Sequence, residues 1–194
     1  MKVFYFDTET TGLNSKVNDI IQLGFIIEID GKVVRKEKLE MQPFDYSSIS
    51  KIALDTHKIS VEKMKTFDTP QIAYAKIVNI LDEYINKYDK EDKFIPAGYN
   101  VKFDMEFLRE FFIKNNNKYF GSYFDYHFID AMAILFLKRY AGKIALDNYK
   151  LETACNYYNI EIKSHDALSD ISATRELLLK VMKEIEWSQT KEKS

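Results

Sequence analysis

Two carboxylates lie two residues apart near the start of the chain, at the end of an apolar run. The run Val3–Phe6 is β-branched and aromatic, which predicts a buried strand. Because side chains alternate along a strand, we expect Asp7 and Glu9 to project from the same face. Buried charges need partners, and hard divalent cations take oxygen ligands. The pair therefore predicts a metal site.

Two further acidic positions follow later in the chain. Asp104 falls in the first turn of a predicted helix, where the helix dipole alone would also favour a carboxylate. His165 and Asp170 open the last long helical segment. They can converge if His165 lies in the loop before the helix and Asp170 lies inside it. Ser164 or Asp166 would then be the helix N-cap.

Together these residues can form one cluster of four carboxylates, Asp7, Glu9, Asp104 and Asp170, with His165 beside it. Crowded carboxylates repel one another, which raises their pKa values unless cations neutralise them. Two Mg²⁺ or Mn²⁺ ions would resolve this repulsion. They would also suit phosphoryl transfer, in which one ion activates water and both stabilise the attacking and leaving oxygens. His165 would accept the proton of the attacking water, because a histidine pKa can be tuned near neutrality.

The segments around these residues predict an α/β fold with a mixed sheet. Strands are expected at Val3–Phe6, Ile20–Ile29, Lys32–Met41, Phe94–Gly98 and Phe124–Ile129. The Asp30–Gly31 pair between the second and third runs predicts a hairpin, so the first three strands should be antiparallel neighbours.

Helical periodicity covers most of the remaining chain. Helices are expected at Gln71–Tyr88, Phe103–Ile113, Ala131–Tyr140, Asp147–Tyr158 and Ala167–Trp187. A hairpin followed by strands that alternate with helices indicates a central sheet flanked by helices. No linker or repeat interrupts the pattern. We therefore expect a single domain over residues 1–187 and a short polar tail over residues 188–194.

Composition narrows the class of protein. The net charge is −2, which argues against a protein that coats nucleic acid through a general positive field. The one cysteine, Cys155, excludes an internal disulfide and lies in an apolar-periodic run, so we expect a buried, inert thiol. The first strand begins at residue 3 and no apolar stretch approaches the ~20 residues of a membrane span. We therefore expect no leader peptide, no membrane partner and a cytoplasmic location.

The acidic motifs resemble those of DnaQ-like exonucleases of the DEDDh group, which have the ribonuclease H-like fold. Residues Phe6–Thr10 resemble the first motif, Asn100–Asp104 the second, and His165–Asp170 the third, His-x-Ala-x-x-Asp. All three occur in the family order. The histidine of the third motif distinguishes this group from the one that uses tyrosine. The resemblance implies a ribonuclease H-like α/β fold with a central mixed five-stranded sheet flanked by helices.

The resemblance also implies an activity. The protein would be a metal-dependent 3′–5′ exonuclease that hydrolyses phosphodiester bonds at the 3′ end of single-stranded DNA and releases nucleoside 5′-monophosphates. Its two divalent metal ions, Mg²⁺ or Mn²⁺, would be bound by Asp7, Glu9, Asp104 and Asp170, and His165 would be the general base.

Contacts to the terminal nucleotide are implied at Thr10, Thr11, Leu13, His57 and Phe103. Leu13 would wedge against the terminal base, and Phe103 would supply an aromatic contact that tolerates any sequence. An ordinary loop histidine is the alternative for His57. Lys58 stands where the family often has glycine, so the local turn can differ.

Several functions share these motifs. A proofreading subunit of a DNA polymerase is one, although we expect the seven residues after Trp187 to leave no room for a long tethering tail. A stand-alone or bacteriophage-type nuclease is equally compatible. The alternative is an exoribonuclease that trims RNA ends or short oligoribonucleotides, because the 2′-hydroxyl contact that would discriminate is not visible in the sequence. An inactive nucleic-acid-binding module is disfavoured, since all four acids and the histidine are present.

Three other features are weaker candidates for a functional role. His127 is expected to be structural. Asp130 could support the site from behind or could cap the helix that follows it. The basic segment Lys138–Lys143 could contact phosphates of an incoming strand or could offset the dipole of its own helix.

Overall fold

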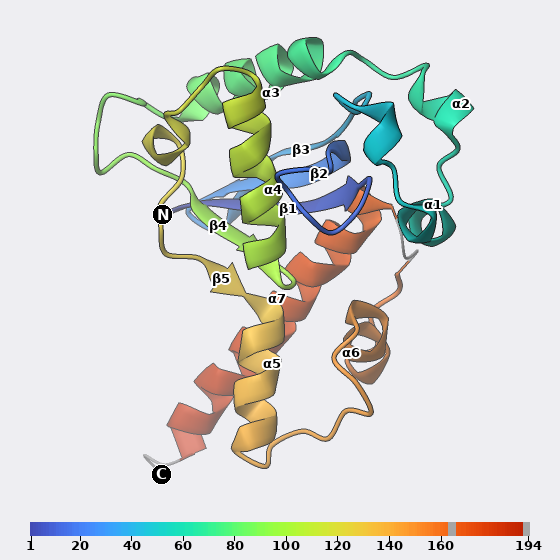
Figure 1. The fold of residues 1–194 in the computed structure, drawn as a ribbon. Helices are drawn as coiled ribbons and strands as arrows, with labels where there is room; N and C mark the ends of the chain where they lie inside the picture. Colours follow the sequence, from blue (N-terminus) through green and yellow to red (C-terminus); the bar gives the residue numbers. More distant parts are fainter. Residues whose placement is uncertain (163–165, 192–194) are drawn as a thin grey trace.

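A mixed sheet of five strands forms the centre of the computed structural model, which describes residues 1–162 and 166–191 (Figure 1). The strands are β1 Lys2–Thr10, β2 Ile20–Ile29, β3 Lys32–Glu40, β4 Ile95–Gly98 and β5 Ile129–Asp130. Their order across the sheet is β3-β2-β1-β4-β5. β1, β2 and β3 are antiparallel neighbours, β4 is parallel to β1, and β5 is parallel to β4. The predicted fold class is confirmed.

Local turn chemistry explains where the strands end. Asp30 and Gly31 both have positive φ angles, 50° and 79°, as a tight two-residue hairpin requires. The fifth strand was predicted too early, over Phe124–Ile129, and the structure has β5 at Ile129–Asp130 instead. Phe124 makes only an isolated bridge to Phe94. The carboxylate of Asp125 accepts hydrogen bonds from the backbone and the ring of the exposed His127, so a polar turn interrupts the pairing.

Helices cover both faces of the sheet (Figure 1). They are α1 Lys51–His57, α2 Val61–Met64, α3 Pro70–Tyr84, α4 Val101–Lys114, α5 Ala131–Tyr140, α6 Leu151–Tyr157 and α7 Ala167–Lys191. Single 3₁₀ turns lie at Tyr46–Ser48 and Phe120–Ser122. None of the helices within the described ranges is long and apolar enough to cross a membrane.

The helix predictions were correct in position and less accurate at the ends. The prediction for α5 matches the structure, whereas α1 and α2 were not predicted. α3 ends four residues early, because polar side chains fold residues 86–92 into turns. α6 starts four residues late, after the Asn148 side chain accepts a hydrogen bond from the Lys150 backbone. α7 continues to Lys191, so the polar segment expected from residue 188 begins inside a helix.

The side chains of β1 alternate between two hydrophobic cores. Phe4 and Phe6 point into the aromatic core between the sheet and α3 and α4. Val3 and Tyr5 point into a second core between the sheet and α5, α6 and α7. Cys155 is buried in the second core, where burial raises its pKa to about 11, as expected for an inert thiol. Beyond Phe6, the same alternation determines on which face of the sheet each polar side chain of β1 lies.

Candidate active site

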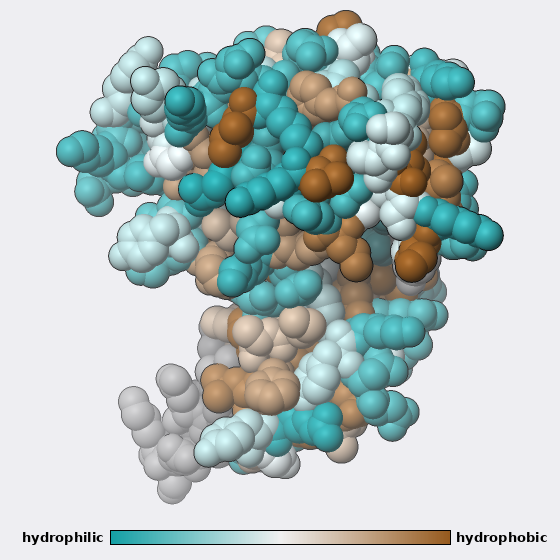
Figure 2. All heavy atoms as spheres, in the orientation of Figure 1, coloured by the Kyte–Doolittle hydropathy of each residue, from teal (hydrophilic) through white to brown (hydrophobic). Residues whose placement is uncertain are grey.

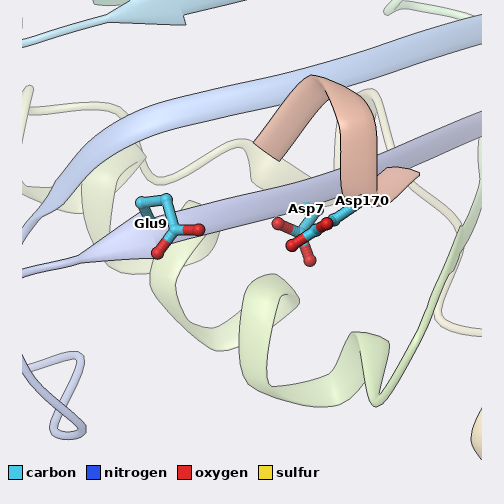
Figure 3. Close-up of side chains that lie close together, drawn as sticks. All are labelled: Asp7, Glu9 and Asp170. Atoms are coloured by element: carbon cyan, nitrogen blue, oxygen red, sulfur yellow. The ribbon is translucent and has the colours of Figure 1, made fainter. Parts of the chain in front are cut away.

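Asp7 and Glu9 continue the series of β1 side chains that face α7. Asp170 lies in the first turn of α7, on the same side of the sheet. Each of these three residues offers a carboxylate oxygen, and these oxygens all lie within 4.8 Å of one another. Figure 3 shows the Asp7 and Asp170 carboxylates directed at each other from strand and helix, with Glu9 further along β1. Residues 163 positions apart in the chain thus meet at one point.

A glycine in β2 permits this close approach. Gly24 pairs with Asp7 across the sheet, and a Cβ at Gly24 would lie 2.3 Å from the backbone carbonyl carbon of Ala167. The first turn of α7 therefore rests directly on the strand, where a larger side chain would push it away. The sequence carried a signal for this contact, because a glycine inside a strand often marks close backbone packing.

The start of α7 is fixed by Asp166 and a lysine from the sheet edge. Asp166 caps the helix, since its carboxylate accepts a hydrogen bond from Ser169 N at 3.0 Å. This confirms one of the two predicted caps; the other, Ser164, lies outside the described residues. Lys38 Nζ on β3 donates to the Asp166 carboxylate at 2.7 Å. Lys38 was not singled out from the sequence, because only the folded sheet brings it to α7.

Asp104 approaches β1 from α4, on the opposite side from Asp170. Its Oδ1 accepts hydrogen bonds from Thr8 N at 2.9 Å and from Thr8 Oγ1 at 2.7 Å. β4 pairs with β1 only as far as Tyr5, so Asp104 supplies the acceptor that a longer β4 would have provided. Asp104 is thus not one of the three acids that lie within 4.8 Å, although its charge raises the pKa values of Asp7 and Glu9.

The starts of α4 and α5 are tied together behind Asp104. Asn100 precedes α4 in a left-handed conformation, with φ 57°. Its backbone N–H donates to Asp130 Oδ1 at 2.9 Å, and the same oxygen accepts from Met132 N at 2.9 Å. Asp130 therefore caps α5 and also holds the turn that delivers Asp104. Both interpretations of Asp130 from the sequence describe part of its role.

Burial and mutual repulsion raise the pKa values of the acids. Burial is the largest cause at each position. The pKa of Asp7 is held well above its usual range by burial and then by the charges of Asp104, Asp170 and Glu9. Burial and the neighbouring carboxylates raise the pKa of Glu9 to about 7. The pKa of Asp104 is also raised to about 7 by burial, against the hydrogen bonds from Thr8.

This donor set fits divalent cations. It consists of carboxylate oxygens alone, which are the ligands of hard cations such as Mg²⁺ and Mn²⁺. The acids repel one another, so cation binding would favour their ionised forms. The cluster is therefore compatible with divalent metal ions. The residue predicted as the general base, His165, lies outside the described residues.

A mostly apolar cavity of about 240 Å³ adjoins the acidic cluster. Its lining residues are Thr8, Glu9, Thr10, Gly12, Leu13, Ser50, Ile52, Ala53, Thr56, His57 and Phe103. Four of the five predicted substrate contacts, Thr10, Leu13, His57 and Phe103, are thus brought together around one hollow. Figure 2 shows hydrophobic side chains around the β1–β2 loop and α1, which form two sides of it.

Leu13 and Ile52 are the most exposed apolar side chains of this cavity, at 85% and 76%. Leu13 is at the tip of the β1–β2 loop, and Ile52 is on α1. Exposed side chains of this kind are available to a flat, apolar ligand surface. Ile52 and Thr56 were missed in the sequence, because α1 was not recognised as a helix and its outer face could not be assigned.

Thr10 and Thr11 hold the loop that carries Leu13. Thr10 Oγ1 donates to Gly12 O at 2.7 Å. Thr11 is fully buried, and its Oγ1 accepts from Asp19 N at 2.9 Å. Asp19 in turn accepts a hydrogen bond from Lys114 Nζ on α4. Thr11 does not line the cavity, so its contact with a nucleotide stays a prediction.

His57 is buried at the end of α1. Its Nδ1 accepts a hydrogen bond from Ile59 N at 3.0 Å. Lys58 between them has φ 60° and ψ 17°, the left-handed conformation that glycine adopts most easily. The lysine therefore keeps the turn that a glycine would make, and His57 still faces the cavity.

Comparison with known proteins supports one family. Residues 4–178 match the model of the RNase_T family, described as exonuclease. The chain is 24% identical over 183 residues to the PolC-type DNA polymerase III of Caldanaerobacter subterraneus subsp. tengcongensis. It is 27% identical over 180 residues to the PolC-type enzyme of Halalkalibacterium halodurans. The match covers 93% and 92% of this chain but only 12% and 11% of the respective polymerases.

Solved structures show the same fold. E. coli exonuclease I bound to a dT13 oligonucleotide superposes with a TM-score of 0.75 at 19% identity, over 93% of this chain and 40% of that one. The complex of the same enzyme with a dA16 oligonucleotide gives a TM-score of 0.75 at 20% identity, over 94% and 41%. The chain thus spans about two-fifths of exonuclease I. At these identities the likeness establishes the architecture.

Proposed function

The chain belongs to the RNase_T exonuclease family, and on this premise we propose that it removes nucleotides from the 3′ end of single-stranded DNA and releases nucleoside 5′-monophosphates. Family membership makes the protein a nuclease and agrees with the resemblance to DnaQ-like exonucleases that its acidic motifs predicted. The observation that carries the finer proposal is the apolar cavity that shares Glu9 with the acidic cluster.

The acidic side chains would bind the metal ions of the reaction. Asp7, Glu9 and Asp170 form the cluster, and Asp104 completes the set from the other side of β1. When bound, two divalent cations activate water and neutralise the charge that develops on the phosphate oxygens. The protein's own part is to keep the carboxylates in place through Gly24, Asp166 and the Thr8 hydrogen bonds.

The cavity would receive the terminal nucleotide. Leu13 and Ile52 offer apolar faces to its base, and Phe103 offers an aromatic ring from the first turn of α4. Apolar and stacking contacts do not read hydrogen-bonding edges, so the enzyme should remove any base. Such a cavity accepts a single unpaired base more readily than a base pair, which supports a single-stranded end.

His165 is assigned the role of general base. A histidine can accept the proton of the attacking water at neutral pH and then release it to solvent. His165 comes two positions before Ala167 in the sequence, and α7 begins at Ala167 against Gly24. This sequence position supports the role of general base.

DNA is favoured over RNA as the substrate. The curated relatives are DNA polymerases, and the exonuclease I structures contain DNA oligonucleotides. A role in proofreading for a DNA polymerase is consistent with the PolC relatives.

Matched oligonucleotides test the proposal. We would offer DNA and RNA, single- and double-stranded, labelled at the 5′ or the 3′ end, with Mg²⁺ or Mn²⁺. Single-stranded DNA labelled at its 5′ end should give a ladder of shortening products, and 3′-labelled DNA should release labelled mononucleotide at once. If RNA is degraded faster than the matched DNA, RNA and not DNA is the preferred substrate. If nucleotides are removed from the 5′ end while the 3′ label stays on the strand, the proposed 3′–5′ polarity is refuted.

A further inference from the structure

The outward face of α5 carries large exposed side chains outside the cavity. Phe136, Leu137 and Tyr140 lie within about 100° of one another around the helix. Their side chains are 61%, 64% and 86% exposed. Figure 2 shows apolar side chains over α5 on the face in view. A contiguous group of this kind on a surface indicates an interaction site.

Planar groups lie next to this face. The rings of Phe136 and Tyr149 have centroids 5.5 Å apart. The guanidinium of Arg139 lies 5.7 Å from the centre of the Tyr149 ring. Tyr99, at the end of β4, donates its hydroxyl to the backbone oxygen of Tyr149 at 2.8 Å. We call Phe136, Arg139, Tyr140, Lys143 and Tyr149 the α5 platform.

The platform is positively charged. No acidic residue occurs between Asp130 and Asp147, whereas Lys138, Arg139 and Lys143 all fall in this interval. Lys138 donates to Tyr158 and pairs with Glu184 of α7, so this lysine has a structural role. Arg139 and Lys143 are exposed and provide the positive charge of the surface.

The helix α5, whose second half carries the platform, begins at the edge of the candidate active site. The helix starts of α4 and α5 meet through the Asn100–Asp130 hydrogen bond, and the two helices run away from each other from this point (Figure 1). Phe103, in the first turn of α4, lines the cavity for the terminal nucleotide. A strand that leaves the cavity past Phe103 would therefore meet α5.

We propose that the α5 platform binds the single strand upstream of its 3′-terminal nucleotide. Phe136, Tyr140 and Tyr149 stack on bases, while Arg139 and Lys143 contact phosphates. Exposed rings interspersed with cations are typical of sequence-independent single-strand binding. The positive charge and the continuity with the cavity favour nucleic acid over a protein partner. This inference rests on the proposed function, because it extends the path of the same strand.

The double substitution Phe136→Ala/Tyr140→Ala tests the platform. We would measure steady-state kinetics on a single-stranded trinucleotide and on a 12-nucleotide strand. The KM for the longer strand should rise about tenfold more than the KM for the trinucleotide, the effect expected from loss of stacking on a base. Tyr88→Ala is the matched control. Tyr88 is 87% exposed and lies in the loop before β4, at the end of β4 opposite to Tyr99. Equal changes on both substrates, or no change on either, would overturn the proposal.

Charge provides a second, independent readout. Arg139→Gln should reduce the slope of log KM against log salt for the 12-nucleotide strand by about 0.7, the value for one phosphate contact on a single strand. An unchanged slope would remove Arg139 from the path of the strand.

Direct binding separates this inference from the proposed function. Fluorescence anisotropy of a 5′-labelled 12-nucleotide strand in EDTA reports binding without hydrolysis. If the wild type binds but never hydrolyses, the proposed function fails, whereas weaker binding by Phe136→Ala/Tyr140→Ala still supports the platform. If the double variant binds like the wild type and light scattering shows only a changed oligomeric state, the surface joins copies of the chain and the proposal is refuted.

Discussion

The acidic cluster should destabilise the folded protein when no cation is bound, and Glu9→Gln tests this cost. Burial raises the pKa of Glu9 from 4.5 to about 7, and the charges of Asp170, Asp104 and Asp166 add to the effect. The pKa of Glu9 is higher in the folded than in the unfolded chain. Protonation of Glu9 therefore stabilises the fold below pH 4.5, and this contribution is lost as the pH rises through 7. At pH 8 the ionised Glu9 therefore costs about 3 kcal/mol, since one pKa step is worth about 1.4 kcal/mol.

Urea unfolding followed by circular dichroism in EDTA measures this cost. Glutamine keeps the shape of the side chain without its charge. Glu9→Gln should therefore raise the free energy of unfolding by about 1 to 3 kcal/mol at pH 8 and by less than about 1 kcal/mol at pH 5. Glu152→Gln, on the exposed side of α6, is the matched control and should change it by less than about 0.5 kcal/mol at either pH.

Divalent metal ions should act on stability in the opposite direction. A ligand that binds only the folded state stabilises it, so Mn²⁺ should stabilise the wild type more than Glu9→Gln. The reasoning would be refuted by a variant that is less stable than the wild type at pH 8 in EDTA. Equal stabilisation of both proteins by Mn²⁺ would exclude Glu9 as a metal ligand.

Three further predictions concern the site. Asp7→Asn or Asp104→Asn should abolish hydrolysis while the circular dichroism spectrum stays unchanged, and appreciable Mg²⁺-dependent activity in either variant would contradict the metal assignment. His165→Ala should lower kcat roughly 10²–10⁴-fold, the usual contribution of a general base, and a rate near that of the wild type would exclude this role. Gly24→Ala places a Cβ against Ala167, so it should lower stability by about 1–3 kcal/mol in urea unfolding and also lower kcat; an unchanged variant would show that α7 can shift without loss.

The amino-acid sequence alone predicted the acids of the candidate site and most of the architecture. Acids at Asp7, Glu9, Asp104 and Asp170 were recognisable because each follows or opens a segment with a clear hydrophobic period. The Asp30–Gly31 hairpin and the family order of the motifs then predicted the sheet. These signals are local, since strand alternation, helix periodicity and turn chemistry depend on neighbours in the chain. Errors came where local signals conflicted, as in the polar turn at Asp125 that displaced the fifth strand.

Only the tertiary structure decided how these parts meet. It placed Asp170 beside Asp7 because Gly24 lets α7 rest on β2, and it brought Asp104 to Thr8 from the other side of β1. It also formed the cavity from a loop, a helix and the start of α4, and so revealed Ile52. Such contacts join residues far apart in the chain through the packing of whole elements. No local pattern encodes that packing, which is why the acids of the candidate site could be named from the sequence but the distances between them could not.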